Sequence, residues 1–547
     1  MAPLLSFKEN SKKITQHFLQ SVVAVDDHIK FESRPVTTDE LEEPEENDFG
    51  EFEPIEQKAK APLSHELYYQ DLSHNFASKG IICGGFSPQE GDLDSSLDAV
   101  VNTSKNSDIT ILDWQMEIAG SDGEFATNTI LRLSENDTAE GGRTRLICVY
   151  TAENTETVAN TLKNSLNTLT PTLDKMTMTF GSQSLTHWKI EVVNKGDIQE
   201  ADLCDFLIDS FTELTAGLLS NAALSSIASI RDNTHNLLHK FNKGLDTAYL
   251  SHVLGLISSP DMREQANEVA FDYAVDLISE ELKSELQTSS IVKNSLSEEV
   301  LMSWPQSLSR RAKAKRFRIK MGEDKVEFNH TTMEKLISAS KEEDLVAVLE
   351  EDLGIKGDSK TTTIDIFNKA LIQLNFDKYD TKPLLDLCSL ESTRRDIVNL
   401  KQHIPALKQG TLIKGNNKYY ICIQPVCDTV RLKGEQSFTF IEACISASDF
   451  THVMKSNGGH LKLNIKPSAK KIKTINFIAN EETKTILSII NEDGVPQFSS
   501  ASNEPPIMFE WCGEFKFTIS QAIVNGLAAQ LARVGLDSFE WLRQKQK

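Results

Sequence analysis

The 547-residue sequence lacks any apolar run long enough to cross a membrane, and its cysteines form no metal-binding or disulfide pattern. A membrane-spanning helix needs about 20 apolar residues in succession, and the opening segment MAPLLSFKENSKK contains no apolar signal core. The eight cysteines include no CxxC pair, which argues against a zinc site and a disulfide framework. We therefore expect a cytoplasmic protein with reduced cysteines and no membrane partner.

Positive charge is also scarce, because the chain has only 57 Lys and Arg residues but 80 Asp and Glu residues. The resulting net charge of −23 argues against general binding to nucleic acid or to anionic membranes. Hydrophobic residues make up 39% of the chain, as in ordinary soluble proteins. A soluble chain of this length is expected to fold into about two to four domains, each with its own core.

Four apolar runs that end on polar side chains organise the amino-terminal part of the chain. Such runs are typical of strands buried on both faces of a parallel sheet, whose carboxyl ends collect ligands. The runs are SVVAVDD (21–27), SDITILDWQM (107–116), RLICVYTA (145–152) and WKIEVVNK (188–195). They are expected to place Asp26 with Asp27, then Asp113, Thr151 and Lys195, at one edge of a sheet.

Helical patterns alternate with these strands, which predicts an α/β fold with a doubly wound parallel sheet and helices on both faces. The elements expected between the four runs are helices at 64–80, 93–102, 125–136 and 156–166, a strand at 81–86, and an extra edge strand at 176–180. The first helix has Gly80 as its natural stop, because glycine favours the end of a helix.

The residue types at the strand ends suit the transfer of a phosphoryl group to a carboxylate. This attack brings two anions together, so a divalent cation is needed to offset their repulsion, and Mg²⁺ prefers carboxylate oxygens and water. Three clustered acids supply both the acceptor and the ligands. The transition state carries charge on its equatorial oxygens, which a lysine ammonium and a hydroxyl donor stabilise.

This ordered set of an acid pair, a single acid, Thr-Ala and Lys resembles the receiver domain of two-component response regulators. The resemblance implies a five-stranded, flavodoxin-like receiver fold. It also implies that Asp113 accepts a phosphoryl group from a partner histidine kinase. One Mg²⁺ would be held by Asp26, Asp27, Asp113 and the backbone of Gln115.

The same resemblance assigns roles to further residues. Thr151 and Lys195 would contact the phosphoryl oxygens, and Gln115 and Glu153 lie where receivers tune the loss of the phosphoryl group to water. An amide and a carboxylate can both orient an attacking water, which predicts a short-lived phosphoryl group. Alternatively, Gln115 and Glu153 are ordinary loop residues whose side chains are solvated.

Two positions depart from the receiver pattern. Receivers usually have proline after the lysine, and here Gly196 follows Lys195, so the peptide is freer. Many receivers also have an aromatic residue three positions before the lysine, where this chain has Val192. The phosphorylation site is therefore expected to be intact, while the usual route from it to an output surface is in doubt.

An acidic, proline-bearing insertion separates the first strand from the first helix, at residues 29–62. It has ten Asp or Glu residues between Asp39 and Glu56. Such a composition cannot bury enough apolar surface to order itself, so we expect a flexible segment. A lid over the phosphorylation site and a docking surface for a basic partner are the two functional alternatives.

Beyond the receiver, long amphipathic helical patterns begin at Asp202 and predict that the last receiver helix runs on into the next domain. From Gly410 the pattern alternates as in strands, with a hairpin turn at GNN (415–417), and the chain ends in a helix from Ser520 to about Gln544. We expect a receiver domain at 1–218, a mainly helical region at 219–405 and an α+β domain at 406–547.

Two local patterns in the helical region have competing interpretations. His235 and His239 lie four apart on a predicted helix, but no nearby acid or Cys completes a zinc site, so solvated or packed histidines are expected. Seven of the eleven residues from Arg310 to Lys320 are basic. This segment fits a charged helix face, a contact for the acidic insertion, or the phosphate contacts of a nucleic-acid-binding response regulator.

Residues 220–547 contain no nucleophile–base pair, P-loop, zinc spacing or dinucleotide fingerprint. The expected chemistry is therefore limited to autophosphorylation and autodephosphorylation at Asp113, unless the carboxy half is an enzyme switched by phosphorylation.

As a whole, the chain is similar to the receiver-only component of Detocs-type antiphage two-component systems. That resemblance implies a phosphate sink, which competes with an effector response regulator for the kinase and prevents effector autoactivation. The sequence leaves open whether the chain forms a homodimer.

Overall fold

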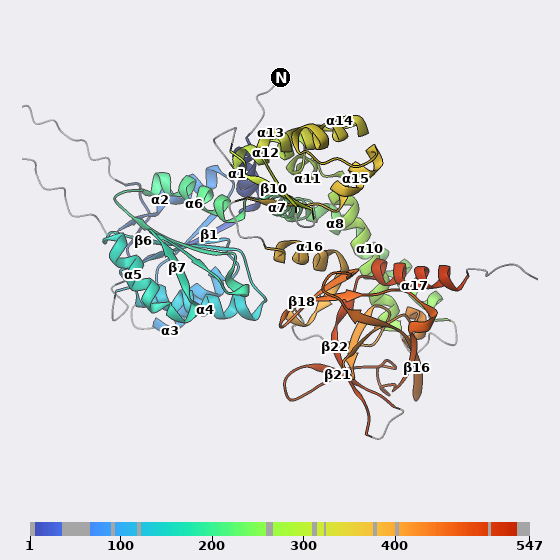
Figure 1. Ribbon diagram of the computed structural model, residues 1–547. Coiled ribbons are helices and arrows are strands. Elements are labelled where there is room, and N and C mark those ends of the chain that lie inside the picture. Colours follow the sequence, from blue (N-terminus) through green and yellow to red (C-terminus); the bar gives the residue numbers. More distant parts are fainter. Residues whose placement is uncertain are drawn as a thin grey trace, which may run out of the picture. The chain divides into compact units, whose positions relative to one another are not determined.

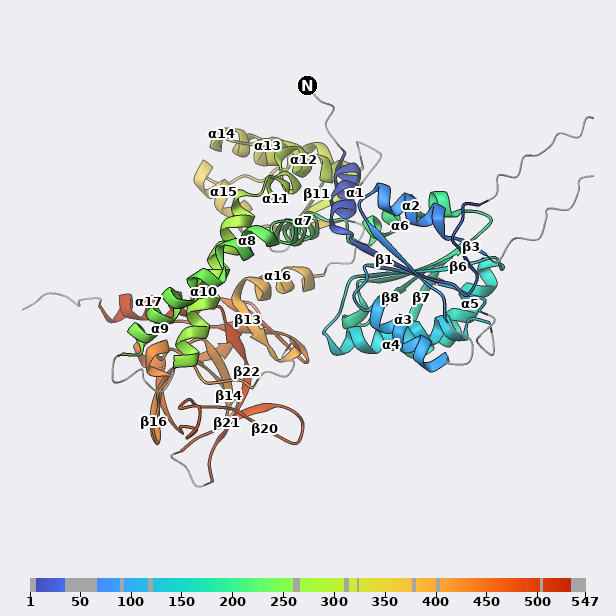
Figure 2. The ribbon, with the colours of Figure 1, turned by 180° about the vertical axis from the view of Figure 1, so that it is seen from behind.

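The computed structural model describes residues 6–34, 66–88, 93–116, 122–258, 266–308, 314–321, 324–375, 380–399, 404–501 and 505–532. The chain divides into two compact units (Figures 1 and 2). The first comprises Met1–Lys240 and Ser279–Phe376, and the second comprises Phe241–Ile278 and Asp377–Lys547. Within the described part, every helix falls short of the length and apolar character that a membrane span requires.

A seven-stranded sheet forms the centre of the amino-terminal part of the first unit (Figure 2). Its strands are β1 (Ser21–Val25), β4 (Ile82–Phe86), β5 (Ile109–Asp113), β6 (Arg145–Thr151), β7 (Pro171–Asp174), β8 (Thr177–Phe180) and β9 (Trp188–Asn194). The spatial order is β4-β1-β5-β6-β9-β8-β7. The first five strands run parallel, which confirms the predicted doubly wound sheet, whereas β8 and β7 extend it as an antiparallel hairpin.

Helices cover both faces of this sheet and bury its apolar side chains. They are α2 (Tyr69–Ser78), α3 (Leu93–Ser104), α4 (Glu124–Ala139), α5 (Thr155–Ser165) and α6 (Glu200–Thr215). Successive residues of a strand point to opposite faces, so Val23 and Val25 belong to the core under α3, α4 and α5, whereas Val22 and Ala24 belong to the core under α2 and α6. Two cores therefore fix the sheet between two helical layers.

The segment around the acidic insertion differs from the prediction. The strands β2 (Ile29–Lys30) and β3 (Leu67–Tyr68) pair in parallel, and α2 begins at Tyr69 instead of Ser64. The helix starts later because Leu67 and Tyr68 are engaged in the strand pair. Residues 35–65, with most of the predicted insertion, lie outside the described residues. Residues 29–34 and 66–68 are called the insertion stem below.

The predicted run-on of the last receiver helix is wrong. The pattern is divided into α6, α7 (Leu218–Asp232) and α8 (Thr234–Lys240). The backbone is extended at Ala216 and Gly217, and glycine is a poor helix former. Helix α7 packs on α1 (Phe7–Phe18), where the Asn221 amide donates a buried hydrogen bond of 2.9 Å to the Ser11 hydroxyl.

The remainder of the first unit contains a three-stranded antiparallel sheet and short helices. Its elements are α11 (Ser290–Ser295), α12 (Glu298–Ser307), β10 (Phe317–Met321), β11 (Asp324–Phe328), α13 (His330–Ser338), α14 (Glu342–Ala347), α15 (Lys360–Asn368) and β12 (Leu371–Leu374). Over the described part of 310–320 the expected charged helix face is not found: residues 314–316 form neither helix nor strand, and 317–320 belong to β10, where Phe317 and Ile319 are buried. Arg318 lies opposite Glu327, so an acid accompanies the basic residues.

The second unit is built on a ten-stranded sheet. Its strands are β13 (Thr393–Asp396), β14 (Thr411–Gly415), β15 (Lys418–Cys422), β16 (Glu435–Ile445), β17 (His452–Ser456), β18 (Gly459–Asn464), β19 (Ile472–Ile478), β20 (Ile489–Ile490), β21 (Pro496–Ser499) and β22 (Met508–Phe515). The predicted hairpin at GNN is confirmed, because Asn416 and Asn417 have positive φ angles between β14 and β15. The helices are α9 (Asp246–Leu256), α16 (Lys382–Ser392) and α17 (Phe517–Leu531), and α10 (Ala266–Thr288) contributes to both units.

Candidate functional site

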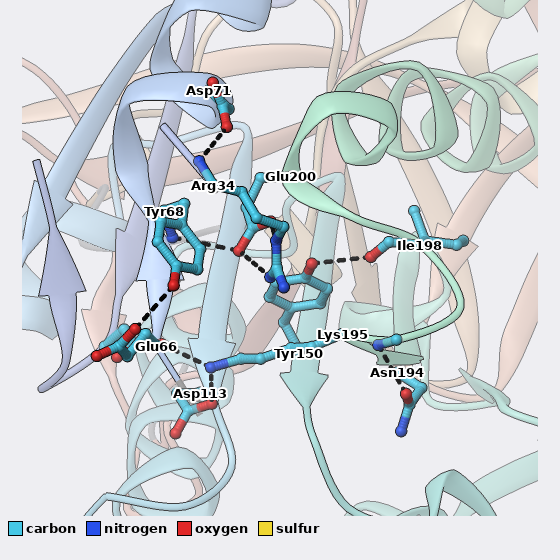
Figure 3. Close-up of polar contacts among 12 residues, drawn as sticks. Arg34, Glu66, Tyr68, Asp71, Asp113, Tyr150, Asn194, Lys195, Ile198 and Glu200 are labelled. Atoms are coloured by element: carbon cyan, nitrogen blue, oxygen red, sulfur yellow. Dashed lines mark hydrogen bonds and ion pairs between the residues drawn. The ribbon is translucent and has the colours of Figure 1, made fainter. Parts of the chain in front are cut away.

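Three acidic side chains and one lysine meet at the carboxyl edge of the parallel sheet. Asp26 and Asp27 directly follow β1, Asp113 is the last residue of β5, and Lys195 directly follows β9. Strands β1 and β5 are adjacent, β6 separates β5 from β9, and all of them run parallel. Their carboxyl ends therefore reach the same edge, where Lys195 points towards Asp113 (Figure 3).

The four side chains are close together and mostly buried. The Lys195 ammonium lies 2.9 Å from Asp26 Oδ2 and 2.9 Å from Asp113 Oδ1. Carboxylate oxygens of Asp26, Asp27 and Asp113 lie within 4.8 Å of one another. Asp26, Asp113 and Lys195 have exposed fractions of 2%, 4% and 1%. The sequence prediction that these residues converge agrees with this geometry.

The donor set fits a hard divalent cation. Mg²⁺ is bound in proteins by one or two carboxylates together with waters and substrate oxygens, and these three acids could each offer one oxygen to a shared ion. Among the described residues, no other group of three or more His, Cys, Asp or Glu side chains has this proximity. His235 and His239 are exposed on α8, in keeping with the predicted solvated histidines.

Burial and like charge make Asp113 unusually basic. Burial raises the pKa of Asp113 to about 7, and the carboxylates of Asp26 and Asp27 act in the same direction, whereas Lys195 opposes them. Burial alone would lower the pKa of Lys195, but the nearby Asp113 and Asp26 carboxylates outweigh it, so the pKa of Lys195 is raised. The lysine therefore stays charged and partly compensates the clustered acids.

Comparison with known protein families agrees with this geometry. Residues 18–195 match the family of response receiver domains. These residues form a response receiver domain. Receiver domains generally take a phosphoryl group from a histidine kinase and bind Mg²⁺ at an acidic cluster, so the chain carries the signature of a two-component signalling protein. Neither a curated protein nor a solved structure matched the chain.

Mg²⁺ should bind the receiver domain more tightly as the pH rises through about 7, the pKa of Asp113. The Asp113 carboxyl must lose its proton before it can act as a ligand, so protons and Mg²⁺ compete. Below the pKa the affinity should change by up to about tenfold per pH unit. Calorimetric titrations at about pH 6 and about pH 8 measure this, and equal affinities would contradict the prediction. The Asp113→Asn variant should show no such slope.

The other predicted phosphoryl and water-positioning residues lie at the ends of β5 and β6 or just beyond them. Thr151 ends β6, its carbonyl accepts a hydrogen bond of 2.7 Å from the Lys195 backbone, and its hydroxyl accepts one of 3.0 Å from the Glu153 backbone. The Gln115 side-chain oxygen is buried and has no hydrogen-bond partner among the described residues. Thr151 is thus fixed beside Lys195, and Gln115 keeps an acceptor available near Asp113.

Trp114 contacts Gly123, the residue directly before α4, and the sequence did not reveal this contact. Its indole is buried, and its carbonyl accepts a hydrogen bond of 2.8 Å from the Gly123 backbone. Gly123 has a positive φ of 78°, and a β-carbon there would lie 2.2 Å from the Trp114 ring. Only glycine fits both conditions. A glycine shortly after β5 was the available signal.

The sequence prediction also missed a second set of interacting polar residues near Lys195 (Figure 3). The Tyr150 hydroxyl donates to the Ile198 carbonyl at 2.8 Å, and the Tyr150 ring centre lies 5.6 Å from the Lys195 ammonium. Arg34, in the insertion stem, forms a two-pronged ion pair with Glu200 at the start of α6. Arg34 and Glu200 are 166 positions apart, so no local pattern could have linked them.

Proposed function

We propose that Asp113 accepts a phosphoryl group from a partner histidine kinase. An oxygen of Asp113 forms a bond to phosphorus while the bond from phosphorus to the kinase histidine nitrogen breaks. The electron pair of that bond returns to the nitrogen, and the product is an acyl phosphate. The observation that carries this proposal is the 2.9 Å contact between Asp113 and the buried Lys195 ammonium, inside a cluster of three acids.

The surrounding residues support this chemistry by charge. Lys195 lies where it can shift from Asp113 Oδ1 to a phosphoryl oxygen, and the Thr151 hydroxyl is proposed as a second donor. Asp26, Asp27, Asp113 and the Gln115 backbone would hold Mg²⁺, which when bound supplies positive charge against the incoming phosphoryl group. Because Asp26 also contacts Lys195, it couples the cation site to the lysine.

We also propose that the phosphoryl group is short-lived and that the chain acts as a phosphate sink. The Gln115 amide oxygen is buried and has no hydrogen-bond partner among the described residues, and the Glu153 backbone donates to the Thr151 hydroxyl, so we propose that both side chains orient an attacking water. A sink in a Detocs-type antiphage system would keep phosphoryl groups from an effector response regulator that shares the kinase. In a cell that holds both partners, loss of this chain should raise the phosphorylated fraction of the effector.

Incubation of the full chain with acetyl phosphate and Mg²⁺ tests both proposals. We expect at most one acid-stable, base-labile phosphoryl group per chain, because the site has one acceptor. A sink should also release free phosphate continuously, well beyond one equivalent of protein. A stable label without further phosphate release would contradict the sink. The absence of both label and phosphate release, with acetyl phosphate and with a cognate kinase, would contradict the acceptor proposal.

A further inference from the structure

The loop that carries Lys195 has to be held in place by something other than proline. Residues 195–199 join β9 to α6, and Gly196 stands directly after the lysine. Glycine has the largest conformational freedom of all residues, so it leaves the peptide next to Lys195 unrestrained by its own geometry. A lysine that must reach two buried carboxylates at 2.9 Å therefore needs external restraints on this loop.

The beginning and middle of the loop are restrained by two side chains from the sheet. The Asn194 side-chain oxygen accepts a hydrogen bond of 2.8 Å from the Gly196 backbone. The Asn194 side-chain amide donates in turn to the Glu153 carbonyl at 2.7 Å. The Tyr150 hydroxyl donates to the Ile198 carbonyl (Figure 3). The far end of the loop leads into α6, whose first residue, Glu200, is bound by Arg34.

Glu200 is held by the insertion stem. The Arg34 Nε and Nη2 atoms each donate to a different Glu200 oxygen at 2.9 Å, and the Tyr68 backbone donates to Glu200 Oε1 at 3.2 Å (Figure 3). The Arg34 guanidinium also lies 4.8 Å from the centre of the Tyr68 ring. Glu200 is only 1% exposed, so its carboxylate depends on these donors.

Arg34 itself is anchored to the receiver domain. Its backbone donates a hydrogen bond of 2.8 Å to Asp71 Oδ2 on α2, and its side chain is only 21% exposed. Burial lowers the pKa of Arg34, but the Glu200 carboxylate outweighs this effect and raises it, so the guanidinium stays charged. A bidentate pair of this kind resists both translation and rotation of the carboxylate.

We propose that Arg34 is a positioning residue for the phosphoryl-transfer reaction, because its ion pair with Glu200 fixes the loop that places Lys195. This inference rests on the proposed function and extends it to a part of the chain outside the acidic cluster. Receivers usually have a proline that restrains this part of the loop. In this chain, an ion pair from the insertion stem provides the restraint instead. A residue of the insertion stem thereby sets the geometry of the lysine.

Four variants of the full chain test the proposal: Arg34→Gln, Arg34→Lys, Glu200→Gln and, as a matched control, Arg132→Gln. Arg132 pairs with Asp98 on the surface of the same domain, away from the loop. The first measurement uses the unphosphorylated protein without Mg²⁺ and follows acylation of Lys195 by acetic anhydride, peptide by peptide. Lys189, which is also buried on β9, serves as the internal reference for general unfolding.

We expect Arg34→Gln and Glu200→Gln to raise the acylation rate of Lys195 about tenfold while Lys189 stays protected. At saturating Mg²⁺ the maximal labelling rate with acetyl phosphate should fall about tenfold, because the lysine is misplaced. Saturating Mg²⁺ separates this fall in rate from any change in Mg²⁺ affinity. Arg34→Lys should be intermediate, since an ammonium cannot form the two-pronged pair.

Several outcomes would overturn the proposal. Unchanged protection of Lys195 in both the Arg34→Gln and the Glu200→Gln variants would mean that the pair does not hold the loop. A labelling rate equal to that of the unmodified chain would mean that Lys195 is placed without it. Equal acylation of Lys189 and Lys195 would indicate a structural role only. If the unmodified chain takes no label, the proposed function fails, and the acylation measurement still decides whether Arg34 places Lys195.

Discussion

Replacement of Asp113 by Asn should lower the rate of phosphoryl labelling by roughly 10³-fold or more. An amide oxygen is a far weaker nucleophile than a carboxylate, and no other side chain is expected to take its place. The change keeps the size of the side chain and still offers an oxygen to the Lys195 ammonium. The measurement is the initial rate of base-labile phosphoryl incorporation from acetyl phosphate at saturating Mg²⁺.

The exposed residue Asp98 provides the matched control for this substitution. Its side chain is 65% exposed on α3, and it forms a surface ion pair with Arg132. The Asp98→Asn variant should label at the rate of the unmodified chain, because surface ion pairs contribute little to structure and nothing to this chemistry. Labelling of Asp113→Asn at a rate close to that of Asp98→Asn would exclude Asp113 as the acceptor.

Replacement of Lys195 by Met should destabilise the Mg²⁺-free protein by about 3 kcal/mol, because removing one partner of a buried ion pair strands the other. Here two carboxylates, those of Asp26 and Asp113, lose the same cation. Excess Mg²⁺ should recover about 2–3 kcal/mol at saturation, since it binds only the folded protein. Urea unfolding with and without Mg²⁺ measures both effects.

Lys189 offers a demanding control for this prediction. It is also buried on β9, and its ammonium lies 2.8 Å from Glu191 and 3.2 Å from Glu213. The Lys189→Met variant should lose a similar free energy of unfolding, but Mg²⁺ should restore no more stability than in the unmodified chain. Equal recovery by Mg²⁺ in both variants would argue against a cation site next to Lys195.

The acidic site could be predicted from sequence because short-range patterns encode it. Each of Asp26, Asp113 and Lys195 lies at or directly beyond the end of an apolar run of strand length. A parallel sheet then brings the ends of such runs to one edge without further information. The alternation of strands and helices also predicted that these strands run parallel, as they do.

Other features depend on contacts that local patterns do not carry. The short edge strand β7 contains Pro171, which weakens the strand signal although proline is acceptable at a sheet edge. The pairing of β2 with β3 spans the acidic insertion, and the ion pair of Arg34 with Glu200 joins residues 166 positions apart. The basic segment containing Arg318 was ambiguous, because alternating and helical patterns overlap in so short a run.

The proposed phosphoryl transfer requires that Asp113 is the residue that carries the phosphoryl group. Borohydride reduction after incubation with acetyl phosphate and Mg²⁺ converts an aspartyl phosphate to homoserine, and peptide mass spectrometry then locates the modified residue. We expect homoserine at position 113 alone, at a yield that matches the bound phosphoryl group. Homoserine at another aspartate, or the longer alcohol that a glutamyl phosphate would give, with Asp113 unchanged, would contradict this assignment.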